Sequence, residues 1–97
     1  MTEFDAAQSA QVVHNLPEQQ FELHLGGKLC LLQYRIAGAK MIIFHTEVPE
    51  SIQNRGLAAR MTAAALDFAR EQNLKVEPRC PYTAAYFRKH RECSDLL

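Results

Sequence analysis

The stretch VPESIQNRGLAARM, residues 48–61, joins two segments of different periodicity. Before it, the apolar run Met41-Ile42-Ile43-Phe44 predicts a strand, and after it an Ala- and Leu-rich segment predicts a helix. A strand that enters a helix through a glycine-containing loop leaves several backbone N–H groups without partners at the helix start. Because these groups and the helix dipole favour negative charge, the stretch predicts an anion-binding turn.

The segments before this stretch predict an antiparallel meander. Strands are expected at residues 12–14, 21–25, 28–36 and 41–48, from β-prone composition and period-two alternation. The Gly26-Gly27 pair between two of them is typical of a hairpin turn. The first half of the chain is therefore expected to form a sheet.

The segments after the stretch predict a helix, a strand and a second helix. Apolar residues recur every three or four positions from Gly56 to about Gln72, and Asn73 is expected to end this helix in a left-handed conformation. Residues 74–78 predict a strand parallel to the one before the helix, because βαβ connections are right-handed. Thr83 is expected to cap the last helix.

Length and composition limit the class of protein. A chain of 97 residues predicts one domain, with residues 1–10 as a loose lead-in and residues 11–97 as the folded unit. Eleven basic and eleven acidic residues give no net charge, so neither nucleic-acid nor membrane binding is expected. The three cysteines are far apart and predict neither a disulfide framework nor a metal site. A cytoplasmic protein, monomeric or weakly dimeric, is expected.

The loop Gln53-x-x-Gly56-x-Ala58 resembles the acyl-CoA-binding signature of the GCN5-related N-acetyltransferases. Its flanks, residues 45–49, 78–82 and 86–90, resemble a small single-domain branch of that superfamily. The resemblance implies an α/β (α+β) acyl-CoA N-acyltransferase fold, with a mostly antiparallel sheet, one parallel splayed strand pair and two helices. It also implies acetyl-CoA or coenzyme A as cosubstrate, without a metal.

The resemblance implies a set of residues that bind coenzyme A. Loop amides would contact the pyrophosphate, arginines would pair with phosphates, and the strand backbone before the loop would bond the pantetheine arm. Many relatives have glycine where Asn54 stands, but asparagine tolerates left-handed angles. The alternatives are another phosphate ligand, or a glycine that only opens a helix. The set comprises Val48, Gln53, Asn54, Arg55, Gly56, Leu57, Ala58 and Arg60.

Three residues are candidates for catalysis. Cys80 follows the second parallel strand and is expected near the acyl sulfur, as a nucleophile or as part of the wall. His45 is a candidate general base, or a histidine bonded within the sheet. The resemblance implies a tyrosine on the last helix as general acid, for which Tyr86 is the nearest match and Tyr82 a weaker substitute.

The expected function is acetyl-CoA-dependent transfer of an acetyl group to an amine, by direct attack or through Cys80. Larger family members carry two helices between their first strands, and here only Gly26-Gly27 joins residues 21–25 to residues 28–36. The acceptor site is therefore expected to be open and to suit an amine on a protein or a small molecule. The alternative is a coenzyme A-binding module or sensor without productive transfer.

Overall fold

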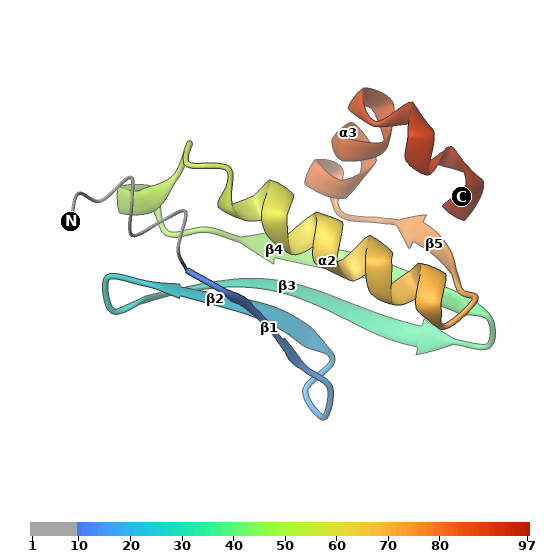
Figure 1. Cartoon of the computed structure of the whole chain (residues 1–97), viewed down its shortest axis with the longest axis horizontal. Helices are drawn as coiled ribbons and strands as arrows, with labels where there is room; N and C mark the ends of the chain where they lie inside the picture. Colours follow the sequence, from blue (N-terminus) through green and yellow to red (C-terminus); the bar gives the residue numbers. More distant parts are fainter. Residues whose placement is uncertain (1–9) are drawn as a thin grey trace.

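The computed structural model describes residues 10–97, and the expected lead-in over residues 1–10 lies outside them except for Ala10. The described chain forms one sheet, two α-helices and two 3₁₀ helices, η1 and η2 (Figure 1). In chain order these are β1 (Val12–Asn15), β2 (Gln20–Leu25), β3 (Lys28–Ala37), β4 (Lys40–Glu47), η1 (Glu50–Ile52), α2 (Leu57–Glu71), β5 (Lys75–Pro78), α3 (Pro81–Lys89) and η2 (Arg91–Leu96).

The sheet has five strands in the order of the chain, β1 to β5. The first three pairings are antiparallel and the pairing of β4 with β5 is parallel. Gly26 and Gly27 turn the chain between β2 and β3 with φ of 58° and 73°, which side chains with a Cβ rarely adopt. The predicted sheet, mostly antiparallel with one parallel pair, is confirmed.

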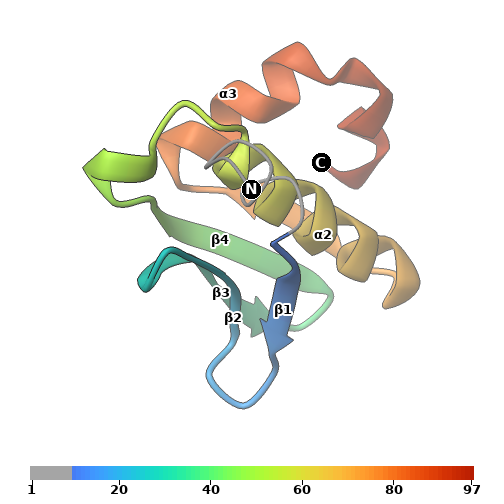
Figure 2. The ribbon, with the colours of Figure 1, turned by 60° about the vertical axis from the view of Figure 1, so that its left-hand side comes forward.

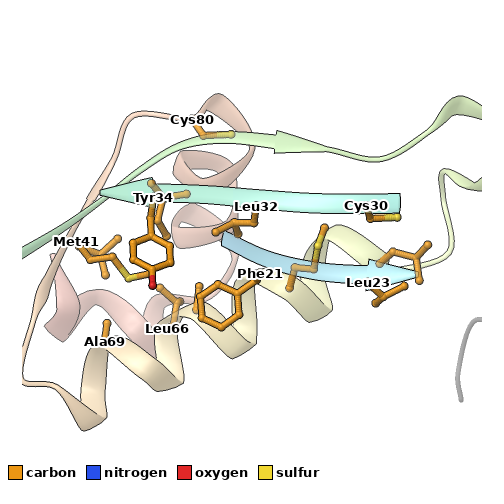
Figure 3. Close-up of a cluster of buried hydrophobic side chains, with 14 of the residues drawn as sticks. Phe21, Leu23, Cys30, Leu32, Tyr34, Met41, Leu66, Ala69 and Cys80 are labelled. Atoms are coloured by element: carbon orange, nitrogen blue, oxygen red, sulfur yellow. The ribbon is translucent and has the colours of Figure 1, made fainter. Parts of the chain in front are cut away.

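Helix α2 lies across one face of the sheet, as Figures 1 and 2 both show. It ends at Glu71, and Asn73 takes the predicted left-handed conformation with φ of 56°. Figure 3 shows side chains of the sheet meeting those of α2 in a continuous core. The buried residues of the helix are Leu57, Met61, Thr62, Ala65, Leu66 and Ala69.

A β-bulge in β4 changes which residues face α2. Tyr34 pairs with Ile43 and Gln33 pairs with His45, so Phe44 is an extra residue opposite β3. Beyond the bulge, Thr46 pairs with Leu32, a fully buried core residue. Because residues directly opposite one another point to the same face, Thr46 faces α2 and His45 faces the uncovered side.

The parallel pair separates after a short contact. β4 and β5 pair only from Lys40 with Lys75 to Ile43 with Pro78. The N–H groups of Arg79 and Cys80 then both donate to the Ile43 carbonyl at 3.0 Å, and the chain leaves the sheet. No strand in the described residues pairs with β4 on that side beyond Ile43, so the predicted splay is present.

The last helix begins earlier than the sequence predicts. Cys80 is the N-cap of α3 and Pro81 is its first residue, which suits proline because that position needs no N–H donor. The prediction that Thr83 caps this helix is therefore wrong. Thr83 lies in the first turn and is fully buried.

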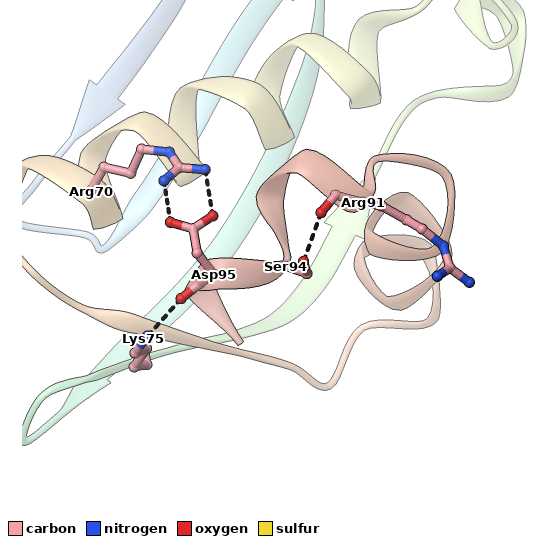
Figure 4. A network of polar contacts seen from close by, with 5 residues as sticks. All are labelled: Arg70, Lys75, Arg91, Ser94 and Asp95. Carbon is pink, nitrogen blue, oxygen red and sulfur yellow. Dashed lines mark hydrogen bonds and ion pairs between the residues drawn. The ribbon is translucent and has the colours of Figure 1, made fainter.

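The chain end is held against α2 and β5 by a small polar network (Figure 4). The Arg70 guanidinium donates two hydrogen bonds to the Asp95 carboxylate, and Lys75 Nζ donates to the Asp95 carbonyl at 2.6 Å. Leu96 of η2 is 4% exposed and joins the core. The residues after α3 are thus part of the folded unit.

Candidate functional site

The start of α2 presents unpaired backbone donors. The first intrahelical bond runs from Arg60 N–H to the Gly56 carbonyl at 3.1 Å, so the N–H groups of Leu57, Ala58 and Ala59 have no acceptor within the helix. No side chain in the described residues caps this end. Gly56 precedes the helix with a left-handed φ of 74°. The helix start therefore has the donors and the dipole that bind an anion.

A cavity of about 420 Å³ opens in front of this helix start. It lies between the end of β4, the loop that follows, the first turn of α2 and the start of α3. Its volume falls within the range of small-molecule sites. Its lining residues are Thr46, Val48, Ile52, Gln53, Asn54, Gly56, Leu57, Ala58, Ala59 and Tyr82.

Most of the predicted cofactor-binding residues line this cavity, and the two arginines do not. Arg55 donates to the Ser51 carbonyl at 3.4 Å, and Arg60 donates to the Ala10 carbonyl. Gln53 does line the cavity, and its side-chain amide donates to the Val48 carbonyl at 3.0 Å. The loop thus reaches the predicted anion site through backbone groups, with the arginine side chains directed to other carbonyls.

The backbone of the loop takes the conformation that its sequence suggests. Asn54 has a left-handed φ of 65°, as Gly56 has two positions later. A Cβ placed on Gly56 would meet no atom within 4 Å, so the space in front of it is open. A phosphate group fits this arrangement because it needs close approach to backbone donors. Val48, Ile52 and Leu57 supply an apolar wall beside it.

Cys80 lies directly behind the cavity wall. Its side chain is buried, with the residue 5% exposed, and Sγ lies 3.5 Å from the hydroxyl of Thr46, which lines the cavity. Burial alone would raise the pKa of the thiol. Hydrogen bonds to the charged sulfur outweigh it, first from the Thr46 hydroxyl, then from the backbone N–H groups of Thr83 and Tyr82, and least from the Thr83 hydroxyl. The pKa of Cys80 therefore lies below its ordinary value.

The other two catalytic candidates lie away from the cavity. His45 faces the uncovered side of the sheet, with its side chain 47% exposed and Nε2 3.8 Å from the Glu47 carboxylate. Tyr86 stacks on the His90 ring with centroids 4.0 Å apart. Burial raises the pKa of Tyr86 and likewise that of Tyr82, the tyrosine that does line the cavity. The structure thus gathers Thr46, Cys80 and Tyr82.

Four residues of the site were not predicted from the sequence. Thr46 precedes Val48 by two positions, so strand alternation could have placed it on the same face, and Ala59 is the next backbone donor after Ala58 at the helix start. Ile52 lies in η1, a single turn that no sequence signal marks. Thr83 was named only as a cap. Within residues 10–97, no three His, Cys, Asp or Glu side chains gather closely enough to hold a metal ion, and no helix there is long and apolar enough to cross a membrane.

Comparisons with known proteins agree with this geometry. The family model described as GCN5-related N-acetyl-transferase matches residues 20–96. Protein NATD1 of Xenopus tropicalis is 34% identical over 89 residues, covering 89% of this chain and 82% of its own length. Protein NATD1 of Gallus gallus is 35% identical over 83 residues, covering 82% and 76%.

The fold has a counterpart among solved structures. The solution structure of a GCN5-like protein from Staphylococcus aureus superimposes with a TM-score of 0.71, over 99% of this chain and 89% of that one. The two sequences are only 21% identical, so this likeness concerns the fold. The family model spans most of the described residues and includes the loop, the splayed strands and Cys80. The chain therefore belongs to the GCN5-related N-acetyltransferase family.

Proposed function

We propose that this protein transfers an acetyl group from acetyl-CoA to an amine on a protein or a small molecule. The observation that carries the proposal is the cavity at the start of α2, which opens where β4 and β5 separate. Family membership supplies the chemistry, since these proteins generally use acetyl-CoA. Acetyl-CoA, the acetyl donor, would then bind at the end of the sheet where the unpaired N–H groups of α2 lie.

The loop residues hold the donor in this proposal. The N–H groups of Leu57, Ala58 and Ala59 bind phosphate oxygens at the helix start. Gly56 keeps the approach free of a side chain. The unpaired edge of β4, from Phe44 to Val48, is available to bond an extended amide-containing arm as a further strand would. Gln53 must release the Val48 carbonyl for that bond to form.

Acetyl transfer then follows one of two routes. In the direct route the amine nitrogen attacks the thioester carbonyl, and the thiol of coenzyme A leaves. In the covalent route Cys80 Sγ attacks the thioester carbonyl, and coenzyme A leaves as its thiol. The amine then attacks the new thioester on Cys80, and the proton that it loses restores the Cys80 thiol. Tyr82, which lines the cavity and stays protonated because burial raises its pKa, is placed to supply a proton to the leaving sulfur.

A binding module without transfer is the second candidate. The direction of His45, away from the cavity, favours it, because the described site then has no histidine base. Tyr86 likewise does not line the cavity. A protein that holds coenzyme A and transfers nothing would need only the loop.

Intact-mass measurement after incubation with acetyl-CoA distinguishes these functions. A gain of one acetyl group that Cys80→Ala abolishes, and Cys93→Ala leaves, supports the covalent route. Acetylated products in an amine panel without acetylated protein support the direct route. Tight coenzyme A binding with neither product supports the binding module.

Thermal unfolding with three ligands tests the donor itself. Coenzyme A should raise the unfolding temperature by mass action, and ATP and NAD should not. An equal response to all three ligands, or to none, would remove the cofactor assignment.

A further inference from the structure

Thr83 is buried in a way that is unfavourable for folding. Its side chain is fully buried, and with Cys80 as a neutral thiol no group in residues 10–97 makes a hydrogen bond to its hydroxyl. A buried hydroxyl without a partner is destabilising, and native proteins contain few of them. Thr62 on α2 is equally buried, but its hydroxyl donates to the Ala58 carbonyl at 2.8 Å. Thr83 does not make that local bond, so its hydroxyl remains unused.

The unused hydroxyl lies beside Cys80. Cys80 is the N-cap of α3, the place where an oxygen-bearing side chain normally accepts a bond from the N–H of the second or third helical residue. No side chain in the described residues caps α3 by a hydrogen bond, so the N–H groups of Tyr82 and Thr83 lack a side-chain acceptor. Thr83 is the third residue of α3, and a side chain at that position reaches back toward the N-cap residue. The Thr46 hydroxyl, on β4, accepts the hydrogen bond of the neutral Cys80 thiol at 3.5 Å.

These groups are donors that surround a poor acceptor. A neutral thiol accepts hydrogen bonds weakly, whereas a thiolate accepts them strongly. The neutral thiol donates its S–H to the Thr46 hydroxyl, which leaves the Thr83 hydroxyl and the N–H groups at the start of α3 without a side-chain acceptor. A charged sulfur can accept from all of these groups, and the Thr46 hydroxyl can then donate to it as well. The first turn of α3 adds the positive end of its dipole.

We propose that Thr83 is a positioning residue whose hydroxyl donates to the Cys80 thiolate. When Cys80 loses its S–H proton to water, the Thr83 O–H turns to the sulfur and gains the partner that it lacks beside the thiol. Thr46 and the N–H groups of Tyr82 and Thr83 complete the set of donors. The inference rests on the proposed function for its purpose, because it prepares Cys80 to take an acetyl group.

The charged groups near Cys80 do not supply this effect. Glu77 and Arg79, at the end of β5, form an ion pair with each other. His45 and Glu47 lie on the opposite face of β4. Tyr82, on α3, is neutral at physiological pH because burial raises its pKa. Hydrogen bonds to the sulfur, with the dipole of α3, are the remaining means of stabilising its charge.

The test is the pKa of Cys80 in three variants, measured without coenzyme A. The readouts are the ultraviolet absorbance of the thiolate, with Cys80→Ser as the blank, and the pH profile of alkylation, resolved by peptide mass spectrometry to separate Cys80 from Cys30 and Cys93. Thr83→Val should raise the pKa of Cys80 by about one to two units, so that its alkylation at neutral pH slows about tenfold or more. Thr83→Ser should keep the profile of the original protein.

Stability provides a second readout, because a purely structural role of Thr83 would make its replacement lower the unfolding temperature. Thr83→Val removes an unpaired buried hydroxyl at nearly constant shape, so the unfolding temperature should stay the same or rise while the thiolate is lost. Thr62→Val is the matched control and should leave the pKa of Cys80 unchanged. The inference is overturned if Thr83→Val leaves the alkylation profile unchanged, or if Thr83→Ser loses the thiolate as Thr83→Val does.

The outcome is separable from that of the proposed function. Alkylation needs no acetyl donor, so a pKa of Cys80 that rises in Thr83→Val supports the role of Thr83 even if no acetyl group is transferred. If the protein transfers acetyl groups but the pKa of Cys80 is the same in Thr83→Val, the proposed function stands and this inference is removed.

Discussion

The two ends of helix α2 are built differently. At its start the helix faces a cavity of about 420 Å³, with no side-chain cap and a left-handed glycine before it. Its second half covers an aromatic cluster in which the His14 ring stacks on Phe21, with centroids 4.1 Å apart, and meets the edge of Phe68 at 4.5 Å. The comparison indicates that one end supplies stability and the other leaves groups available for a ligand.

The largest effect should come from the packed end. Phe21 is 3% exposed, so Phe21→Ala should lower the free energy of unfolding by about 3–5 kcal/mol. Phe44→Ala is the matched control, because Phe44 is 38% exposed on the bulge and packs on Arg35. It should lower that free energy by less than about 1 kcal/mol. Equal losses in urea titrations would contradict the division between packed and open regions.

The open end should respond in binding more than in stability. Gly56→Asp places a carboxylate in front of the unpaired N–H groups, so the affinity for coenzyme A should fall at least about tenfold, or about 1.4 kcal/mol. Gly38→Asp, in the turn at the other end of β4, is the control. Gly38 has a similar φ of 61° and also has open space around it. Isothermal titration that gives equal affinities for both variants would remove the loop from the site.

A pH titration sharpens the description of the packed end. Burial lowers the pKa of His14, whose Nε2 lies within hydrogen-bond distance of the Tyr34 hydroxyl. The folded protein therefore binds a proton at His14 less readily than the unfolded chain does. The contribution of this cluster should be complete above the ordinary histidine pKa of about 6.5 and should decline as the pH falls below it.

The variant His14→Gln should reduce this decline, because glutamine can bond the tyrosine without titrating. Urea titrations at several pH values measure the difference between the two proteins. Identical pH dependence in both would show that His14 does not titrate on unfolding.

The smallest effect should come from the polar clamp near the end of α2. Arg70 and Asp95 are exposed, so Arg70→Ala should shift the unfolding temperature only slightly, and high salt should remove the shift. Leu96→Ala, beside the same clamp, should shift it much more, because Leu96 is buried. If the unfolding temperature of Arg70→Ala falls equally at low and high salt, Arg70 stabilises η2 by something other than its ion pair with Asp95.

The sequence by itself determined the strands, helix α2 and the position of the loop. Alternation predicted the strands, the change of period at Gly56 predicted α2, and the spacing of Gln53, Gly56 and Ala58 indicated the anion site. These signals are local, since each depends on residues a few positions apart. Local periodicity is the information that a single sequence carries best.

Only the tertiary structure decided which side chains meet. The bulge at Phe44 exchanges the faces of the residues after it, turning Thr46 toward Cys80 and His45 away. A strand of fixed period two cannot predict this, because one inserted residue reverses every later side chain. The start of α3 at Pro81 likewise placed Thr83 beside the cysteine instead of at the cap. The loop before α2 could thus be predicted from local sequence, whereas the surroundings of Cys80 depend on how β4, β5 and α3 pack together.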